Sequence, residues 1–424
     1  MDRNCRGPRL IVVLFHGTWA GGVLSSRKTV VSELVKTISD HENVYEIRVN
    51  GVGSDINVLD KFGGGLFGWG TSRNVVTGYR NLSSQYRTGD RIVLIGYSRG
   101  AWAARYLAML INILGLPKED DEAYFHQVYR ACGNMDRILE LQNSMPLRAY
   151  EHQCSMLLRH RWIPRLASDR TCQTTRIAAS QKNMNDDVSN TAPNVEYAFH
   201  CVALHETRAP YKPTLMEGPN VHQVFFPGNH GHMGFVDDKE GLEHVPLAWM
   251  IQQLHTRLNL SFDETKLAER FPSYQPTQSP QLPSDMPEEK TPDSVSAMPR
   301  WCRVEIKPYS LPRLMLLGRK PRQPEMQVHI GARLRTEVDE TNAVPDFILT
   351  AITRKPYWTR RQPPRSKWSW SHGTRTDSEL HTPRRSSSSR RDTSTIMLQE
   401  AKVGSLEMNL LGIPPTVWQG GEEE

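Results

Sequence analysis

Short apolar runs that stop at turn residues recur along the first part of the chain. They span residues 10–15, 44–49, 91–95 and 224–226, and each is followed within two positions by a glycine. Continuous apolar runs closed by turn residues are typical of parallel β-strands that are buried on both faces. Weaker patterns predict two further strands, at residues 197–204 and 326–330.

Segments of helical length lie between and after these runs. Residues 28–40 and 243–258 carry apolar side chains at helical spacing. Residues 101–114 are apolar on most faces and are followed by Gly115-Leu116-Pro117, which is a helix stop signal. An alternation of strands and helices predicts an α/β fold, with a mostly parallel sheet flanked by helices.

Changes in composition divide the chain into segments. Residues 8–270 are predicted to form the main α/β domain, and residues 300–355, where apolar content returns, its C-terminal part. Residues 120–190 are rich in charge and helix formers and predict a helical insertion or cap. Residues 271–299 contain seven prolines and predict a linker or exposed loop. Residues 356–424, rich in Ser, Arg and Pro, predict a disordered tail.

The net charge of +6 comes from the tail. Residues 354–391 hold eleven Lys or Arg against two acidic residues, so the rest of the chain sums to −3. The basic balance therefore says little about the substrate of the main domain. We expect no nucleic-acid binding. Two interpretations of the tail stay open: peripheral contact with acidic membrane, and a tail that is simply solvated.

The cysteines and the hydropathy pattern bear on the compartment. The six cysteines form no CxxC pair, so neither a zinc knuckle nor a redox motif is indicated. No apolar run reaches the roughly 18–20 residues that a membrane span needs. The run at 10–15 is also shorter than the apolar region of a signal peptide. We expect a cytoplasmic protein that needs no cofactor; its oligomeric state stays open.

The segment Gly96-Tyr97-Ser98-Arg99-Gly100 lies where a predicted strand meets a predicted helix. A serine hydroxyl is a poor nucleophile unless a base takes its proton and the backbone exposes it. Glycines two positions before and after Ser98 permit the tight strand-to-helix turn that exposes the hydroxyl. The pattern predicts Ser98 as a nucleophile; the alternative is a serine that only caps the helix.

The segment His16-Gly17-Thr18 directly follows the first predicted strand. A backbone N–H of Gly17 or Thr18, paired with that of Arg99, would form an oxyanion hole. An ordinary tight turn is the alternative. We interpret His16 as structural, because the base in this kind of site follows the serine in the chain.

A glycine-bounded loop with two histidines, His230 and His232, follows the strand at 224–226. The base is expected after the later strands, which favours His230. Glu206 follows the strand predicted at 197–204 and is the candidate acid. A solvated Glu206 paired with Arg208 is the alternative, and both interpretations stay open.

Several motifs occur in a characteristic order. They are HGTW at 16–19, NGVG at 50–53, FGGGLFGWG at 62–70, YSRGAWAARYLAMLI at 97–111, ALHETRAPYKPTL at 203–215, VFFPGNHGHMG at 224–234 and PLAWMI at 246–251. Over roughly residues 8–350 the chain resembles a family of unknown function, especially its fungal members, that shares an α/β-hydrolase domain with type VI secretion phospholipase effectors. The resemblance implies an α/β-hydrolase fold and hydrolysis of a lipid or other small-molecule ester, with the nucleophile at Ser98 and the base at His230.

The sequence departs from the family pattern where the family has acidic residues. His16, His205 and His232 stand at positions that are Asp in its DGTW, ALDE and HSDVGG motifs, and Phe235 replaces a glycine. Residues 177–184, where an FDTVGS-type motif carries an Asp, contain no acid. A triad without its acid loses much of its rate. A second interpretation is therefore a degenerate hydrolase that binds a lipid or a protein without turnover.

A metal site is a third interpretation. His16, His205, His230 and His232 all follow predicted strands, whose carboxyl ends share one edge in a parallel sheet. Imidazole suits zinc or copper. The spacing of these histidines fits no standard metal motif, so we predict no metal site.

Overall fold

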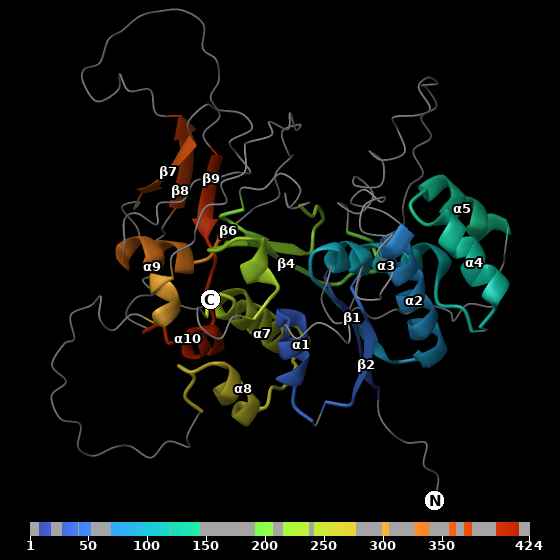
Figure 1. Ribbon diagram of the computed structural model, residues 1–424, viewed down its shortest axis with the longest axis horizontal. Helices are drawn as coiled ribbons and strands as arrows, with labels where there is room; N and C mark the ends of the chain where they lie inside the picture. The colour runs from blue at the N-terminus through green and yellow to red at the C-terminus, as the bar shows by residue number, and fades with distance from the viewer. Residues whose placement is uncertain are drawn as a thin grey trace, which may run out of the picture. The chain divides into compact units, whose positions relative to one another are not determined.

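The structure is a computed structural model (Figure 1). It describes residues 8–17, 28–40, 42–51, 69–118, 120–144, 191–206, 215–236, 241–276, 299–304, 327–338, 356–361, 369–374 and 396–414. The chain forms two compact units, each assembled from separate stretches. Unit 1 comprises Met1–Phe199, Thr214–His222 and His255–Asp263, and unit 2 comprises His200–Pro213, Gln223–Leu254 and Glu264–Glu424.

The sheet of unit 1 has three parallel strands. The central strand β1 (Leu10–Phe15) lies between β2 (Val44–Val49) and β3 (Arg91–Gly96). Every residue of β1 is buried, as its apolar and β-branched sequence requires of a strand covered on both faces. The strands predicted from the apolar runs at 10–15, 44–49 and 91–95 are therefore confirmed.

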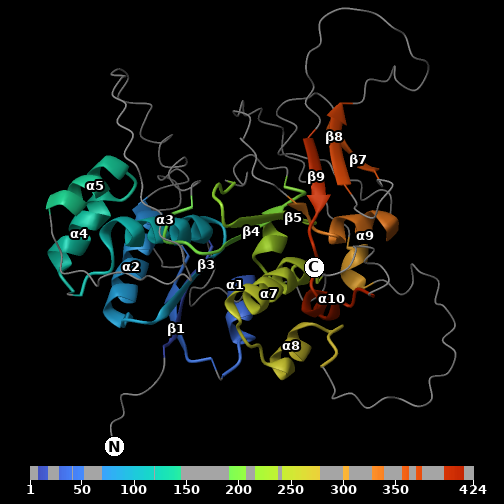
Figure 2. The same cartoon turned by 180° about the vertical axis from the view of Figure 1, so that it is seen from behind.

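Three helices cover this sheet. Figures 1 and 2 show α1 (Val30–Lys36) and α2 (Trp69–Gln85) on opposite sides of β1 and β2. The third, α3 (Arg99–Leu114), follows β3 and buries eleven of its residues, nine of which form one core cluster with α2 and the sheet. The helices predicted within 28–40 and at 101–114 are confirmed.

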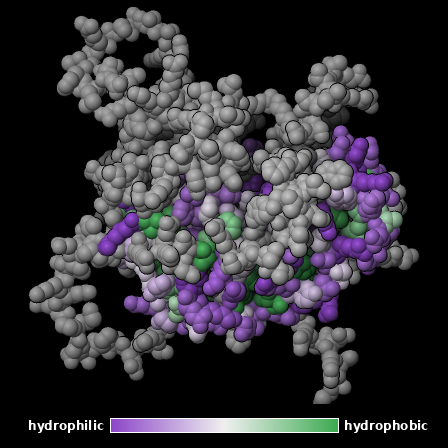
Figure 3. Space-filling model, in the orientation of Figure 1, coloured by the Kyte–Doolittle hydropathy of each residue, from purple (hydrophilic) through white to green (hydrophobic). Residues whose placement is uncertain are grey.

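A pair of shorter helices continues the same core. These are α4 (Glu122–Ala131) and α5 (Met135–Ser144), whose buried Tyr124, Val128 and Ile138 belong to the core cluster of α2 and α3. Figure 3 shows their outer surface as mainly hydrophilic. Both helices fall within the predicted insertion at 120–190, and residues 145–190 lie outside the described residues.

The second sheet has six strands in the order β4-β5-β6-β9-β8-β7. β5, β6 and β9 are parallel, whereas β8 runs antiparallel to β9 and β7. The strands are β4 (Ala198–Ala203), β5 (Val221–Phe226), β6 (Gln327–Val328), β7 (Pro356–Arg361), β8 (Ser369–Thr374) and β9 (Ile396–Glu400). The strands predicted around 197–204, 224–226 and 326–330 are confirmed.

Helices accompany this second sheet. They are α7 (His244–Leu258), α8 (Glu264–Arg270), α9 (Gly331–Val338), α10 (Ser405–Leu411) and the 3-10 turns η3 (His230–Met233) and η4 (Arg300–Arg303). The helix predicted at 243–258 is α7 and is confirmed. None of the helices in the described part of the chain is both long enough and apolar enough to cross a membrane.

The prediction of a disordered tail over 356–424 is wrong for its described segments. The backbone forms β7, β8 and β9, and α10 buries Leu410 and Leu411. Glu407 on α10 is fully buried, and its Oε1 lies 2.8 Å from Nε2 of the equally buried His329. The Ser- and Arg-rich composition of the whole tail concealed the apolar residues between Ile396 and Ile413. The other tail residues lie outside the described ones.

Candidate active site

Ser98 lies at the turn from β3 into α3 and has an unusual backbone conformation. Its φ is 58° and its ψ is −125°. Positive φ is uncommon for a residue with a Cβ, and such a conformation costs on the order of 1–3 kcal/mol. Its side chain makes no capping hydrogen bond to α3, so the interpretation of Ser98 as a simple helix cap is not supported. Ser98 therefore has the strained strand-to-helix backbone that its interpretation as a nucleophile requires, and we call this turn the elbow.

The glycines on either side of Ser98 are required by close backbone approaches. A Cβ on Gly96 would lie 2.3 Å from the carbonyl oxygen of Gly100. A Cβ on Gly100 would lie 2.2 Å from the carbonyl oxygen of Phe15, at the end of β1. Both distances are far inside van der Waals contact, and in each case the obstacle is backbone. The turn can therefore form only with glycine at both positions.

Two of the three predicted oxyanion donors lie at this elbow. Arg99 is the first residue of α3. Gly17 is buried, and a Cβ there would lie 2.6 Å from the ring of Tyr97, the residue before Ser98. Gly17, two residues after the end of β1, thus lies directly beside the turn at Ser98. Thr18, the third candidate, lies outside the described residues.

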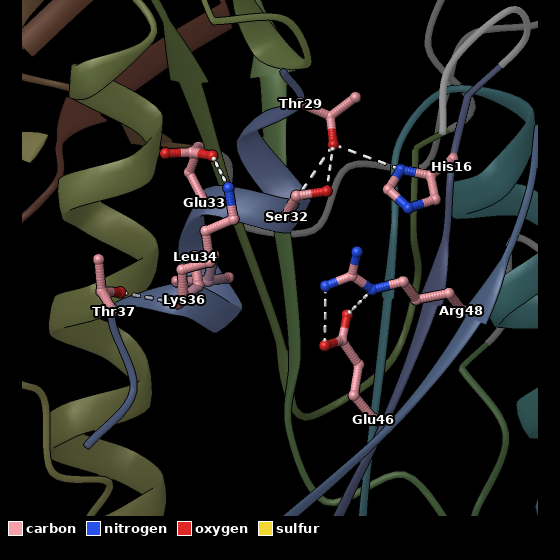
Figure 4. A network of polar contacts seen from close by, with 9 residues as sticks. All are labelled: His16, Thr29, Ser32, Glu33, Leu34, Lys36, Thr37, Glu46 and Arg48. Carbon is pink, nitrogen blue, oxygen red and sulfur yellow. Dashed lines mark hydrogen bonds and ion pairs between the residues drawn. The ribbon is translucent and has the colours of Figure 1, made fainter. Parts of the chain in front are cut away.

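His16, the residue before Gly17, is buried in a polar network shown in Figure 4. Its Nδ1 lies 3.3 Å from the hydroxyl of Thr29, which caps the N-terminus of α1. Burial lowers the pKa of His16, and the guanidinium of nearby Arg48 lowers it further, while Glu46 opposes both. The neutral ring and its contact with the cap of α1 fit the structural role expected for His16.

His230 is placed by the turn η3, which follows β5. Two main-chain bonds tie this region to the end of β4, because the N–H of Leu204 donates to Phe226 and that of His205 donates to Gly228, both at 2.9 Å. Residues that are far apart in the sequence, around 205 and around 230, are thereby brought together.

Four consecutive backbone N–H groups, those of residues 228–231, each donate to a side chain; we call this segment the His230 loop. The pairs are Gly228 to His205 Nδ1 at 2.9 Å, Asn229 to His232 Nδ1 at 3.1 Å, His230 to Glu206 Oε2 at 3.0 Å and Gly231 to Asn229 Oδ1 at 2.9 Å. The loop has no regular backbone pairing at these positions. Side chains therefore satisfy these partly buried backbone N–H groups instead.

Glu206 is 1% exposed, so the interpretation of a solvated glutamate is wrong. Its carboxylate accepts the main-chain N–H of His230, which places a buried carboxylate next to the candidate base. His205 is also enclosed: burial, with the positive charge of Arg335 and the neighbouring His232, lowers its pKa to about 3. The ring of His205 is therefore neutral at physiological pH.

The structure brings the candidate residues together as two groups. Unit 1 holds Ser98, Gly17 and Arg99, and unit 2 holds Glu206 and His230. Asn229 was not predicted, although an Asn before a short helical turn is a familiar capping signal. In the described part of the chain, no group of three or more His, Cys, Asp or Glu is placed to hold a metal ion.

A family model described as "T6SS, Phospholipase effector Tle1-like, catalytic domain" matches residues 9–253. The chain belongs to this family. The predicted resemblance to type VI secretion phospholipase effectors is thereby confirmed, and Tle1-like membership supports a hydrolase that acts on ester bonds. The matched region contains Ser98, Glu206 and His230. No curated protein and no solved structure matches the chain.

Proposed function

We propose that this Tle1-like chain is a serine ester hydrolase with an α/β-hydrolase fold, and that its substrate is a phospholipid or another acyl ester. The observation that carries the proposal is the conformation of Ser98. A β-strand, a serine at positive φ and a helix follow one another, and backbone contacts leave room only for glycine on either side. Strain of this kind persists where the surrounding structure enforces it, and it concentrates at functional sites.

The reaction follows the general course of serine esterases. Ser98 Oγ attacks the ester carbonyl carbon while its proton passes to His230. The C–O bond to the alcohol then breaks, and His230 returns the proton to the leaving oxygen. Water, activated by His230, hydrolyses the acyl–Ser98 ester and releases the fatty acid. The proposal requires Ser98 Oγ and a ring nitrogen of His230 to come within about 3 Å of one another.

Negative charge builds up on the carbonyl oxygen during each attack. The backbone N–H groups of Arg99 and of the loop at Gly17 and Thr18 are the proposed donors to that oxygen. Arg99 opens a helix of sixteen residues, whose N-terminal dipole favours a negative charge at that end. One donor of this kind is worth roughly 10²- to 10³-fold in kcat.

Glu206 is the proposed acidic member of the site. Its buried carboxylate is held against the main chain of His230, where its negative charge stabilises the imidazolium that forms when Ser98 loses its proton. A buried carboxylate has little solvent to screen it, so its effect on a neighbouring cation is strong.

The test is labelling by a fluorophosphonate probe, combined with release of fatty acid from phosphatidylcholine vesicles. Wild type should label and hydrolyse, whereas Ser98→Ala should do neither. His230→Ala should lower the rate of hydrolysis by roughly 10²- to 10⁴-fold. Ser84→Ala is the matched control, because Ser84 is an exposed serine on α2 whose hydroxyl donates to the carbonyl of Asn81 in the same helix.

A folded wild-type protein that never labels would refute the enzyme. The alternative would then remain, a degenerate hydrolase that binds lipid or protein without turnover. Its supporting observation is that His16, His205 and His232 replace the acidic residues of the family. Labelling of wild type with hydrolysis of a simple ester but not of vesicles would retain the esterase and exclude the phospholipid.

A further inference from the structure

The His230 loop is held in part by two histidine side chains that have no role in the proposed reaction. Two of the acceptors that hold it are imidazole nitrogens, on His205 and His232. A ring nitrogen accepts a hydrogen bond only through a free lone pair, so both rings must be neutral with their proton on Nε2. Burial and the charge of Arg335 keep His205 in that neutral form.

These two imidazoles act on the backbone immediately around His230. His232 accepts from the residue before His230, and Glu206 accepts from His230 itself. His205 holds Gly228 through two hydrogen bonds. Its ring Nδ1 accepts from the Gly228 N–H, and its main-chain N–H donates to the Gly228 carbonyl. The main chain that carries the His230 side chain is therefore held by groups outside its own ring.

Gly228 shows how tightly this arrangement is built. Its φ is 120°, a conformation that favours glycine, and a Cβ there would lie 2.9 Å from the Cβ of His232. The loop and the ring of His232 are thus packed directly against one another. A displaced imidazole would leave N–H groups without acceptors in a partly buried loop.

We propose that His205 and His232 are positioning residues, neutral hydrogen-bond acceptors that hold the backbone of residues 228–231 and so orient His230 for proton transfer. The inference rests on the proposed function. It assigns a purpose to two histidines that stand where the resembling family has Asp. An imidazole Nδ1 accepts a backbone N–H as a carboxylate oxygen does, but it brings no negative charge to the loop.

The first experiment measures hydrolysis of p-nitrophenyl butyrate by wild type, His205→Leu and His205→Asn. Leucine removes the acceptor at nearly constant size, whereas the Oδ1 of asparagine occupies about the position of Nδ1. A misplaced general base should lower kcat by roughly 10- to 100-fold in His205→Leu, with KM changed less than about twofold. His205→Asn should recover kcat to within about threefold of wild type.

A matched control removes an imidazole from β4, the strand that ends two residues before His205. His200 on β4 also bonds through Nδ1, but to the side chain of Gln223 at 2.8 Å and not to the His230 loop. His200→Leu should therefore leave kcat unchanged. If His200→Leu and His205→Leu lower kcat equally, or if His205→Asn is no better than His205→Leu, the positioning role is refuted.

The second experiment needs no activity. Amide hydrogen exchange, followed by mass spectrometry of the peptide that contains residues 228–231, should show slow exchange in wild type and faster exchange in His205→Leu and His232→Leu. His205→Asn and His232→Asn should restore slow exchange. Unchanged exchange in both leucine variants would overturn the inference, even in an active enzyme.

The two experiments separate the inference from the proposed function. A wild-type protein that fails to label with fluorophosphonate refutes the proposed hydrolase activity, and with it the proposal that His205 and His232 orient a catalytic base. A labelled wild type whose His205→Leu variant keeps both kcat and slow exchange refutes only the positioning role. If His205→Leu does not fold, the exchange difference between His232→Leu and His232→Asn decides the matter.

Discussion

The turn at Ser98 and the His230 loop are held in shape by different forces. At Ser98 the constraint is steric: carbonyl oxygens of Gly100 and Phe15 occupy the space that side chains on Gly96 and Gly100 would need. In the His230 loop the constraint is polar, because four successive N–H groups each depend on one side-chain acceptor. A sterically enforced turn resists small changes in solution conditions. A loop held by imidazole and carboxylate acceptors depends on their protonation.

The largest effect should come from adding a methyl group at the elbow. Gly100→Ala places a Cβ 2.2 Å from the backbone oxygen of Phe15. The start of α3 and the end of β1 cannot move apart without disturbing the packing of β1. We expect a loss of about 3 kcal/mol in the free energy of unfolding, measured by urea denaturation.

The same change in the His230 loop provides the comparison. Among the residues that the structure describes, a Cβ on Gly231 would meet only the side-chain Oδ1 of Asn229, at 3.2 Å, so Gly231→Ala should cost less than about 1 kcal/mol. Equal losses at the two glycines would show that the elbow is not under steric control.

Removal of the buried acceptor Glu206 should have the next largest effect. Glu206→Ala leaves the N–H of His230 without its partner and should cost about 2 kcal/mol in urea denaturation. Glu206→Gln keeps an acceptor and should retain most of the stability, but it removes the charge and should lower kcat by roughly 10²- to 10⁴-fold. A Gln variant with full activity would exclude Glu206 as the acid.

Acid should weaken the His230 loop through His205. Its pKa is lowered to about 3, from an ordinary 6.5, so between these values the unfolded chain binds a proton that the folded chain excludes. Stability therefore falls as the pH drops below about 6.5, and this one group should cost about 2 kcal/mol between pH 7 and pH 5.

The measurement compares urea unfolding of wild type and His205→Asn at the two pH values. The wild type should lose about 2 kcal/mol more than the variant. The pKa of His16 and of His222 is also lowered by burial, but both residues remain in the variant, so their contribution cancels. Parallel pH curves for the two proteins would contradict the neutral state of His205.

The smallest effect should be a gain. Ser98→Gly relieves the positive φ and should raise the free energy of unfolding by about 1 kcal/mol while abolishing activity. Asn259, which follows α7 and has a φ of 52°, offers the matched control. Because Asn tolerates that conformation, Asn259→Gly should change stability little, and it should leave activity intact. A destabilised Ser98→Gly variant would show that the serine side chain contributes more than its backbone strain costs.

The sequence predicted the sterically controlled part of the molecule better than the polar part. β1 and β2 were predicted to the residue, since buried parallel strands are nearly continuous apolar runs, and the two glycines around Ser98 marked the elbow. The pairings of the His230 loop could not be predicted, because Glu206 and His230 meet only once β4 and β5 lie side by side.

Helix α2 was missed for a different reason. Its sequence contains Thr, Val, Ser and a glycine at 78, all weak helix formers. That glycine lets the helix approach β1 so closely that a Cβ there would lie 2.6 Å from the ring of Phe15. Tertiary packing thus overrides local propensity. The tail was mispredicted because α10 is short and its burial depends on partners such as His329, far away in the sequence.

The pairing of β6 with β9 has a consequence for the order of events during synthesis. Val328 lies opposite Glu400, so the strand that follows β6 in the sheet is made long after β6 itself. All of unit 1 has been translated once Asp263 is added, whereas unit 2 still lacks β9 and α10. Since domains fold as units while the chain grows, the elbow can form on the ribosome before the sheet that carries the His230 loop is complete.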